Sequence, residues 1–550
     1  MQSLTVPTLV AVISMVSIAC GGAQSAPVAS VPGGPKTDRL VMALPGPSEE
    51  SNETRHLNQP QVWQLRPMFE YVLGMDAKTG KMIPELATEW KLEPDGQSFR
   101  FKLRQGVKFH NDTGEFTAAD IKFTWEDFTQ DDSAHGQAIQ FKKGVARIEV
   151  VSDYEAVIQL TEPDGNFLHA LGEAEGGMEV VGKASAAKQG APSLQAQPYA
   201  GTGPYQYVGR QQGTHVRYKR VPYQHWKTTP DFNEFEFRFI KEGSTRLAGL
   251  LTGELHLATL PEDLMIEATK QGMKTLRGQV PGLRTFMRAH CCNYLDPKDP
   301  SKGMKYPDSP LWDVRVRRAL NKAINRDELN KAFFGGKGEN IINNHFHPTR
   351  PGWNPDWEKR YQDEYGFDQA KARALLAEAG YSAAKPLETN IFPTSLPQYA
   401  GAEDVAESIA GYWRSVGVKV NLTPMDQAEY ERQRRGDLFQ NLYALVGTSS
   451  DLFIAQVYTG LAGGRSLTGS KVVDPKVDAL VDTVYKTLDE ERQDRIWRQV
   501  GDAIFPLHQT INLFWLPAEI MVNPKYVDDW VFPGAITGTW THVQNIKATR

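Results

Sequence analysis

Histidines and cysteines that lie close together in the sequence are the first candidates for chemistry, because their side chains bind metals and act as nucleophiles. His345 and His347 are one residue apart, and on a strand both would face the same side. A proline and two asparagines flank them, which favours a plain loop. His290 precedes the adjacent pair Cys291 and Cys292, but no second cysteine pair at metal-binding spacing exists. We therefore expect two small, partly buried apolar residues at 291 and 292, and no metal site at either place.

The chain carries no recognisable catalytic arrangement. It has neither a Gly-x-Ser-x-Gly elbow nor a His-Glu-x-x-His helix. Acidic pairs such as Glu49 and Glu50 are adjacent in the sequence, so they point to different sides and are expected to be solvated. Scattered serines, histidines and aspartates occur in any long chain and carry no weight alone. The sequence therefore predicts a protein that is not an enzyme and needs no cofactor.

The overall composition is that of a large globular protein. The 550 residues are 40% hydrophobic and 23% charged, with a net charge of −5. A chain of this length forms two to four domains. Its charge balance lacks the basic surplus of nucleic-acid-binding proteins, so no nucleic-acid partner is expected. With 3 cysteines, disulfides are not expected to organise the fold.

The N-terminal region has the pattern of an export signal. Residues 4–19 are uncharged and apolar, and they fall short of the roughly 20 residues that span a bilayer. The run ends at Ala19-Cys20-Gly21-Gly22, which resembles a bacterial lipoprotein cleavage site. We therefore predict a signal peptide over 1–19, lipidation of Cys20, and a Gly-, Ser- and Pro-rich tether over 20–37. The alternatives are a signal peptide cut elsewhere and a buried segment.

Behind the tether, the first readable patterns indicate strands. Phe99, Phe101 and Leu103 alternate with basic residues after a Pro-Asp-Gly turn at 94–96, which predicts a half-exposed hairpin strand. Residues 107–109 are predicted as a second short strand.

Helix signals appear later and alternate with strands. Thr117 with an aspartate three residues on, Asp313 and Asp368 are predicted helix starts. Residues 403–416 place apolar side chains on one helical face, stop at Gly417, and lead into a strand at 418–420. We expect one or two helices over 475–505 and a strand over 511–515. This alternation is typical of α/β folds.

Four landmarks then resemble the extracellular solute-binding proteins of the peptide/nickel type, family 5. They follow the order found in that family and extend over essentially the whole chain behind the tether. The matching segments are Leu86–Trp90 with Phe101–His110 and Phe116–Ile121; Gly201–Tyr205; Val314–Leu320 with Ala323–Arg326; and Leu375–Tyr381.

The resemblance implies a periplasmic-binding-protein-like α/β fold of type II, cluster C. Two α/β lobes would be joined by a hinge, and an extra β-rich domain would sit on the first lobe. On this reading lobe I comprises 38–69, 201–285 and 505–550. The extra domain is 70–200, and lobe II is 286–504.

The resemblance also implies a ligand site between the lobes and delivery of the ligand to the permease of an ABC importer. We expect a monomer, held at the outer face of the cytoplasmic membrane by its lipid, with a peptide or other small molecule as ligand. Gln61 and Trp63 are the candidates from lobe I, although Trp63 also fits a core position. Ser449, Ser450 and Asp451 are the candidates from lobe II.

Two alternatives stay open within this fold. In peptide-binding relatives an aspartate shortly follows a tryptophan late in lobe II, whereas here the tryptophan is absent and Asp451 is offset. A ligand other than a free peptide is therefore considered, including a nickel-type metal chelate near His345 and His347. The other alternative is an envelope sensor or chaperone-like protein without an importer.

Overall fold

The computed structural model describes residues 35–550 with internal gaps. The gaps are residues 48, 58, 136, 174–176, 190–192, 195, 297–298, 394–401, 426–428, 431, 434–437, 449–470 and 535–539. The predicted signal peptide, Cys20 and most of the tether lie outside the described residues. No helix in the described part of the chain has the length and apolar character needed to cross a bilayer.

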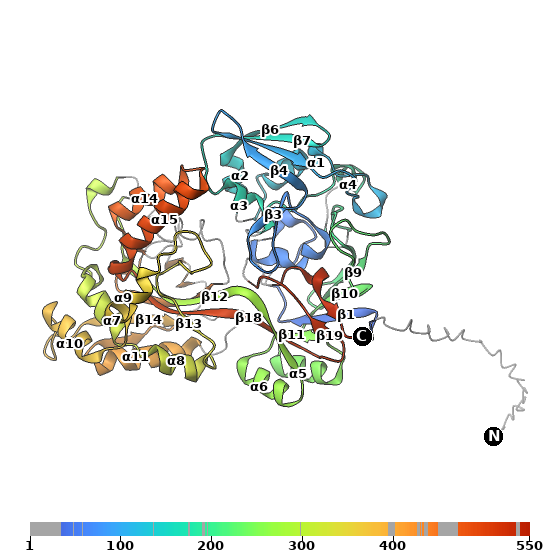
Figure 1. Cartoon of the computed structure of the whole chain (residues 1–550). Coiled ribbons are helices and arrows are strands. Elements are labelled where there is room, and N and C mark those ends of the chain that lie inside the picture. The colour runs from blue at the N-terminus through green and yellow to red at the C-terminus, as the bar shows by residue number, and fades with distance from the viewer. Residues whose placement is uncertain are drawn as a thin grey trace, which may run out of the picture. The chain divides into compact units, whose positions relative to one another are not determined.

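Two long antiparallel strands run through the largest sheet. β12 (Lys274–Cys292) pairs with β18 (Thr510–Val522), and Figure 1 shows them side by side between two groups of helices. The strands beyond β12 are β16 (Leu442–Thr448), β14 (Glu388–Pro393) and β15 (Lys419–Leu422). Those beyond β18 are β11 (Leu257–Ala258), β1 (Arg39–Leu44), β10 (Glu234–Phe239), β9 (His215–Arg220) and β8 (Tyr205–Gln211). Predicted strand 511–515 is thus confirmed within β18.

The pairing of β12 with β18 is irregular around Pro281 and shifts once more between Thr285 and Phe286. Its register shifts between Arg277 and Pro281 and again between Pro281 and Leu283. Proline has no N–H for the ladder, so it breaks regular pairing. At Gly282 the backbone of residue 534 comes so close that an added Cβ would lie 2.1 Å from Gly534 O. This irregular stretch separates the two flanks of the sheet along β12.

A separate four-stranded sheet has the order β4 (Ala87–Leu92), β5 (Ser98–Leu103), β7 (Glu155–Leu160) and β6 (Val145–Ser152). The predicted hairpin is confirmed, because Leu92 pairs with Phe99 and Asp95 Oδ1 accepts from the Ser98 N–H at 2.9 Å. The strand predicted at 107–109 is wrong, since Lys108 makes only an isolated bridge to Glu115.

The predicted helix starts are confirmed. Thr117 and its partner aspartate form a capping box at α1 (Ala118–Phe128). Asp313 caps α7 (Val314–Lys322), and Asp368 caps α10 (Gln369–Glu378). α11 (Ala402–Ser415) is followed by Gly417, whose φ of 93° requires the left-handed region that glycine reaches without strain.

The remaining elements cover the sheets. Region 475–505 forms two helices because Asp489 caps the second one. The other helices are α2 (Ala138–Gly144), α3 (Phe167–Leu171), α4 (Lys183–Gln189), α5 (Gly243–Thr252), α6 (Glu262–Lys270), α8 (Arg326–Phe333), α9 (Asp356–Tyr365), α14 (Pro475–Tyr485) and α15 (Glu490–Ile504). The short strands are β2 (Leu73–Met75), β3 (Met82–Pro84), β13 (Glu339–Asn340), β17 (Lys471–Val472), β19 (Val527–Asp529) and β20 (Lys547–Ala548).

Separate hydrophobic cores lie under the sheets. One packs Trp413 and Tyr443 between α11 and β16, and another gathers Phe235 and Phe237 of β10. A third lies beneath the four-stranded sheet, around Phe101. The domain boundaries that the family resemblance implies stay predictions.

Candidate functional site

The two faces of β12 differ sharply just beyond its irregular stretch. Side chains alternate along a strand, so residues two apart share a face. Met287 and Ala289 point into the core that α7, α8 and α11 cover. Arg284, Phe286 and Arg288 occupy the opposite face. This face of the sheet therefore carries cations and an aromatic ring where the other face is apolar.

Two aromatic rings hold three guanidinium groups together on that face. Phe286 and Trp515 belong to one small buried cluster, and each is 2% exposed. The Arg284 guanidinium lies 4.3 Å from the Phe286 ring centre and 5.9 Å from the Trp515 ring centre. Arg288 lies 5.7 Å from Phe286, and Arg350 lies 4.6 Å from Trp515. We call Arg284, Arg288 and Arg350 the arginine cluster.

His345 joins two members of the arginine cluster. Arg284 Nη1 lies 2.6 Å from His345 Nδ1 and donates to Asn344 Oδ1 at 3.2 Å, while Arg350 Nη1 donates to the His345 carbonyl at 3.4 Å. A guanidinium can only donate, so His345 Nδ1 accepts and carries no proton. Burial lowers the pKa of His345 well below its usual value, and Arg284, Arg350 and Arg288 lower it further. The imidazole is therefore neutral and orients Arg284.

The backbone turns sharply at His345 to present its ring. The Phe346 N–H donates to the Asn343 carbonyl at 3.1 Å, and the φ of His345 is 69°. This left-handed conformation is uncommon for residues with a Cβ and persists where surrounding contacts fix it. The conformation is consistent with a positioning role for His345.

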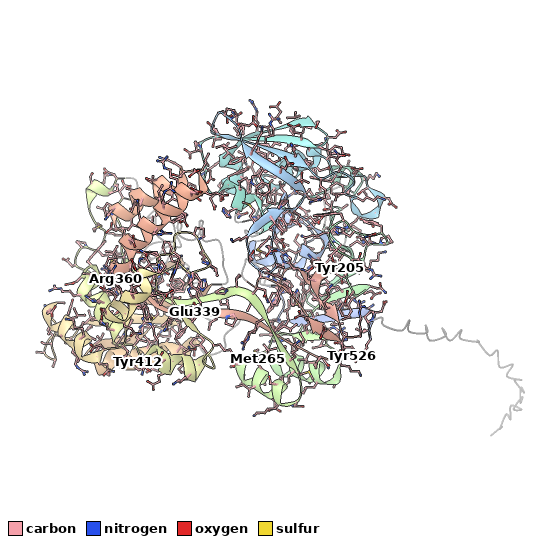
Figure 2. All side chains as sticks on the ribbon, viewed as in Figure 1. Tyr205, Met265, Glu339, Arg360, Tyr412 and Tyr526 are labelled. Atoms are coloured by element: carbon pink, nitrogen blue, oxygen red, sulfur yellow. A yellow bond between two sulfur atoms is a disulfide. The ribbon has the colours of Figure 1, made fainter. Side chains whose placement is uncertain are left out.

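The second histidine of this pair faces other partners. The Thr349 N–H donates to His347 Nδ1 at 3.2 Å, and His347 Nε2 lies 3.3 Å from Glu339 Oε1. In the view of Figure 2, Glu339 lies between Tyr412 of α11 and Tyr205 of β8. In the described part of the chain no three His, Cys, Asp or Glu side chains converge as a metal site. Cationic neighbours also repel a metal ion from His345, so the geometry disfavours direct metal binding there.

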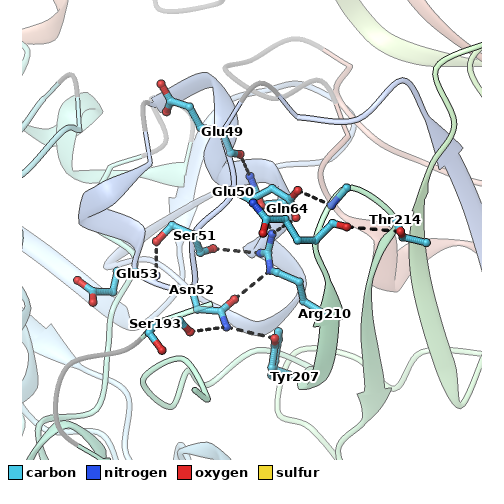
Figure 3. A network of polar contacts seen from close by, with 12 residues as sticks. Glu49, Glu50, Ser51, Asn52, Glu53, Gln64, Ser193, Tyr207, Arg210 and Thr214 are labelled. Carbon is cyan, nitrogen blue, oxygen red and sulfur yellow. Dashed lines mark hydrogen bonds and ion pairs between the residues drawn. The ribbon is translucent and has the colours of Figure 1, made fainter. Parts of the chain in front are cut away.

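The candidate residues from lobe I lie on a segment that a buried arginine anchors. Gln61 and Trp63 belong to the 3-10 helix Gln59–Gln64, and the side chain of Gln61 lies outside the described residues. Arg210 of β8 donates to Gln64 Oε1 at 2.6 Å and to Glu50 Oε2 at 2.9 Å (Figure 3). The Arg210 side chain is 1% exposed. These contacts fix the path of residues 50–64 across the sheet.

Trp63 packs against the sheet in this segment. It is 8% exposed and meets the edges of Phe237 and Phe239, with ring centres 5.0 and 6.1 Å apart. This is the core environment that the sequence left as an alternative to ligand contact. Ligand contact by Trp63 stays a prediction.

The candidates from lobe II follow the strand next to the arginine cluster. β16 ends at Thr448, which pairs directly with Arg284 of β12. Ser449, Ser450 and Asp451 come next in the sequence and lie outside the described residues. Their proposed ligand contacts stay a prediction.

The adjacent cysteines form a vicinal disulfide. Cys291 and Cys292 are 2% and 0% exposed, so they are buried more fully than predicted. The expectation of two unbonded cysteines was wrong, because a bond joins their sulfur atoms. Bonded sulfurs are not thiolate ligands, and His290 Nε2 lies 3.0 Å from the Tyr430 hydroxyl. The arrangement therefore does not support the metal alternative at this place.

A contact links the loop after β7 to the helices α14 and α15. The Gly165 N–H donates to the Tyr485 carbonyl at 2.7 Å, and Gln493 Nε2 donates to the Gly165 carbonyl at 3.2 Å. A hollow of about 400 Å³ opens beside it, lined on one side by Pro163 and on the other by Lys486 and other helix residues. We call this loop–helix contact the rim contact.

Sequence reasoning missed the arginine cluster. A signal was present in Arg284-x-Phe286-x-Arg288, where cations and an aromatic ring alternate with apolar residues at the spacing of a strand. The contribution of Arg350 and Trp515 had no local signal, because the fold brings them in from distant segments.

Comparison with known proteins gives a consistent assignment. The profile of the bacterial extracellular solute-binding proteins, family 5, matches residues 81–460. The dipeptide-binding protein of Escherichia coli K12 is 27% identical over 473 residues, covering 81% of this chain and 84% of that protein. Heme-binding protein A of Haemophilus influenzae is 26% identical over 446 residues, covering 76% of each chain.

A solved structure supports the fold. The periplasmic binding protein DppA of Helicobacter pylori, solved with the peptide STSA, superposes with a TM-score of 0.70 at 22% identity, covering 93% of this chain and 97% of that one. The fold is therefore that of type II periplasmic binding proteins, as predicted. Because the family profile spans well over half of the sequence, this chain belongs to the family 5 bacterial extracellular solute-binding proteins.

Proposed function

We propose that this chain is the substrate-binding protein of an ABC importer, which captures a peptide-like or other small solute and delivers it to a membrane permease. Membership of family 5 carries the proposal. The relatives named above bind dipeptides or heme, so the family membership leaves the ligand of this chain open. The protein does no covalent chemistry on its ligand and acts by binding alone.

The ligand would lie over β12 and β18, between the two flanks of the sheet. Binding sites concentrate where two parts of a protein meet, because closure buries the ligand on both sides. The irregular stretch around Pro281 would serve as the hinge between the proposed lobes. Ligand contacts made only in the closed form would shift the population toward that form, which then docks on the permease.

We test capture with the soluble chain, residues 38–550, by small-angle scattering and thermal unfolding. The expected result is a rise in melting temperature and a smaller radius of gyration with a panel of short peptides and small organic solutes. A panel that changes neither quantity at millimolar concentrations would reject capture by closure.

The proposal includes an anchor at Cys20. The apolar run before it and the flexible tether after it support lipidation at this residue. Labelling of bacteria with radioactive palmitate should mark the wild-type chain at the membrane, whereas Cys20→Ser should be unlabelled. An unlabelled wild-type chain would reject the anchor and leave the binding function untouched.

A further inference from the structure

The rim contact joins two parts of the chain that each have a hydrophobic core of their own. The four-stranded sheet packs over the core around Phe101, whereas α14 and α15, the helix pair, share a core with Trp357 of α9. In the view of Figure 1, the helix pair reaches toward the four-stranded sheet above β12 and β18. Because each part has its own core, the rim contact connects them without building either one.

The two parts are attached on opposite sides of the irregular stretch in β12 and β18. The helix pair follows β17, which pairs with β12 at His290 and Cys292, and it leads into β18 at Thr510. The four-stranded sheet lies between β1 and β8 in the sequence, on the flank that reaches β18 through β11 at Val522. Pro281 lies between these two attachments along β12. An opening motion at Pro281 therefore pulls the rim contact apart.

Hydrogen bonds from both helices bind one glycine of the loop after β7. Carbonyls in the last turn of a helix need partners from outside that helix. The Gly165 N–H donates to the Tyr485 carbonyl, at the end of α14, at 2.7 Å. Gln493 of α15 donates from Nε2 to the Gly165 carbonyl at 3.2 Å and to the Thr487 carbonyl at 3.1 Å. Both polar backbone groups of Gly165 are therefore bonded to the helix pair.

Leu488 adds an apolar contact to these bonds. It lies between α14 and α15 in the sequence and packs, partly buried, against the core of the four-stranded sheet. The hollow of about 400 Å³ beside it shows that the two parts meet along a narrow strip and not over a broad face. A contact this small can open and close in the folded protein, and it still biases the balance between the two states.

We propose that the rim contact is a latch, which closes the chain across from the hinge at Pro281 and favours the closed form before any ligand arrives. The latch uses the hinge of the proposed function, but its contacts lie away from the arginine cluster and from Trp63. A ligand that binds the closed form gains apparent affinity in proportion to the population that is already closed. The latch would therefore adjust affinity without touching the ligand.

The test measures the distance between the two parts in the absence of any ligand. Lys91→Cys on β4 and Glu491→Cys on α15 place one spin label on each part, and double electron–electron resonance reports their separation in residues 38–550. The two replaced side chains are 68% and 89% exposed, so labels fit there without repacking. Cys291 and Cys292 are bonded to each other and take no label.

Two latch variants are compared with two matched controls. Leu488→Ser removes the apolar contact, and Gln493→Met removes the donor to Gly165 at similar side-chain length. Leu480→Ser is the control for the first, because Leu480 packs against the core of the helix pair. Gln499→Met is the control for the second, because Gln499 is exposed on α15.

We expect the wild-type chain to show mainly a short distance. Each latch variant should raise the ratio of long to short distances by about fivefold or more, because it loses a contact of about 1 kcal/mol. Both controls should keep the wild-type distribution. Circular dichroism melts show whether each variant is folded, and Gly165→Ala, which breaks the same contact from the loop side, replaces a latch variant that does not fold.

The latch is rejected if the wild-type chain shows only the long distance, or if both folded latch variants keep the wild-type distribution. Controls that open as far as the latch variants also reject it. Opening in one latch variant alone supports the latch and assigns it to that residue. Because no ligand is used, these results stay separate from the test of solute capture, and either proposal can fail while the other holds.

Discussion

The rim contact allows a sharp test of how the loop after β7 and the helices α14 and α15 hold together. An added Cβ at Gly165 would lie 2.5 Å from Thr487 O and 2.5 Å from Gln493 Nε2, closer than atoms can approach. Gly165→Ala must therefore separate the loop from the helices. The backbone at Gly165 is not left-handed, so alanine adds no strain of its own.

The size of the effect follows from the bonds that are lost. Separation breaks the hydrogen bonds of Gly165 with Tyr485 and Gln493. At about 1 kcal/mol each they contribute about 2 kcal/mol to the closed contact. This free energy corresponds to an opening equilibrium shifted about 30-fold.

Hydrogen exchange measures this opening directly. Amides in the segment 164–167 should exchange about 30-fold faster in Gly165→Ala than in wild type, because exchange rates follow the opening equilibrium. Small-angle scattering should show a larger radius of gyration for the variant. Gly209→Ala is the matched control, since its added Cβ meets nothing within 4 Å. Unchanged exchange and scattering in Gly165→Ala would refute the reasoning.

Three further predictions follow from buried groups. Denatured residues 38–550 should take up no iodoacetamide before reduction and two equivalents after it, because Cys291 and Cys292 are bonded; uptake before reduction would show free thiols. The Arg210 side chain is 1% exposed and pairs with the Glu50 carboxylate. Arg210→Met leaves that carboxylate without its cation, so it should lower the free energy of unfolding, measured in urea, by about 3–5 kcal/mol. Arg39→Met, at an ion pair 41% exposed, should cost about 1 kcal/mol or less, and equal costs would contradict the difference. Burial lowers the pKa of His110 to about 4, below its usual 6.5, so the unfolded chain binds this proton first as pH falls. The contribution of His110 to stability is therefore complete above pH 6.5 and should fall by about 1.4 kcal/mol per pH unit down to pH 4, so unfolding curves of wild type and His110→Asn should converge over this range. A constant difference between the two would contradict the shift.

Local sequence patterns were sufficient to predict most of the helices and strands named in the sequence analysis. Capping residues such as Asp313 and Asp368 act within one helical turn, and the alternation around Phe101 is complete within six residues, so the sequence is sufficient to find them. The short strand predicted at 107–109 failed because strand pairing needs a partner that the local sequence does not specify.

The candidate site depends on contacts that local patterns do not encode. Arg284 and His345 are 61 positions apart, and only the register of β12 with its neighbours brings them together. The vicinal disulfide was missed because two adjacent cysteines look the same in the sequence whether reduced or bonded. Motif order identified the family, since its landmarks are turns and helix starts that local sequence does encode.

The central claim is that this chain captures one small solute. Native mass spectrometry of gently purified residues 38–550, with and without the panel of short peptides and small organic solutes, tests it most directly. The account predicts the mass of a single chain carrying one small molecule, which denaturation releases. A chain that stays free of any such adduct at millimolar concentrations of every probe would contradict the claim.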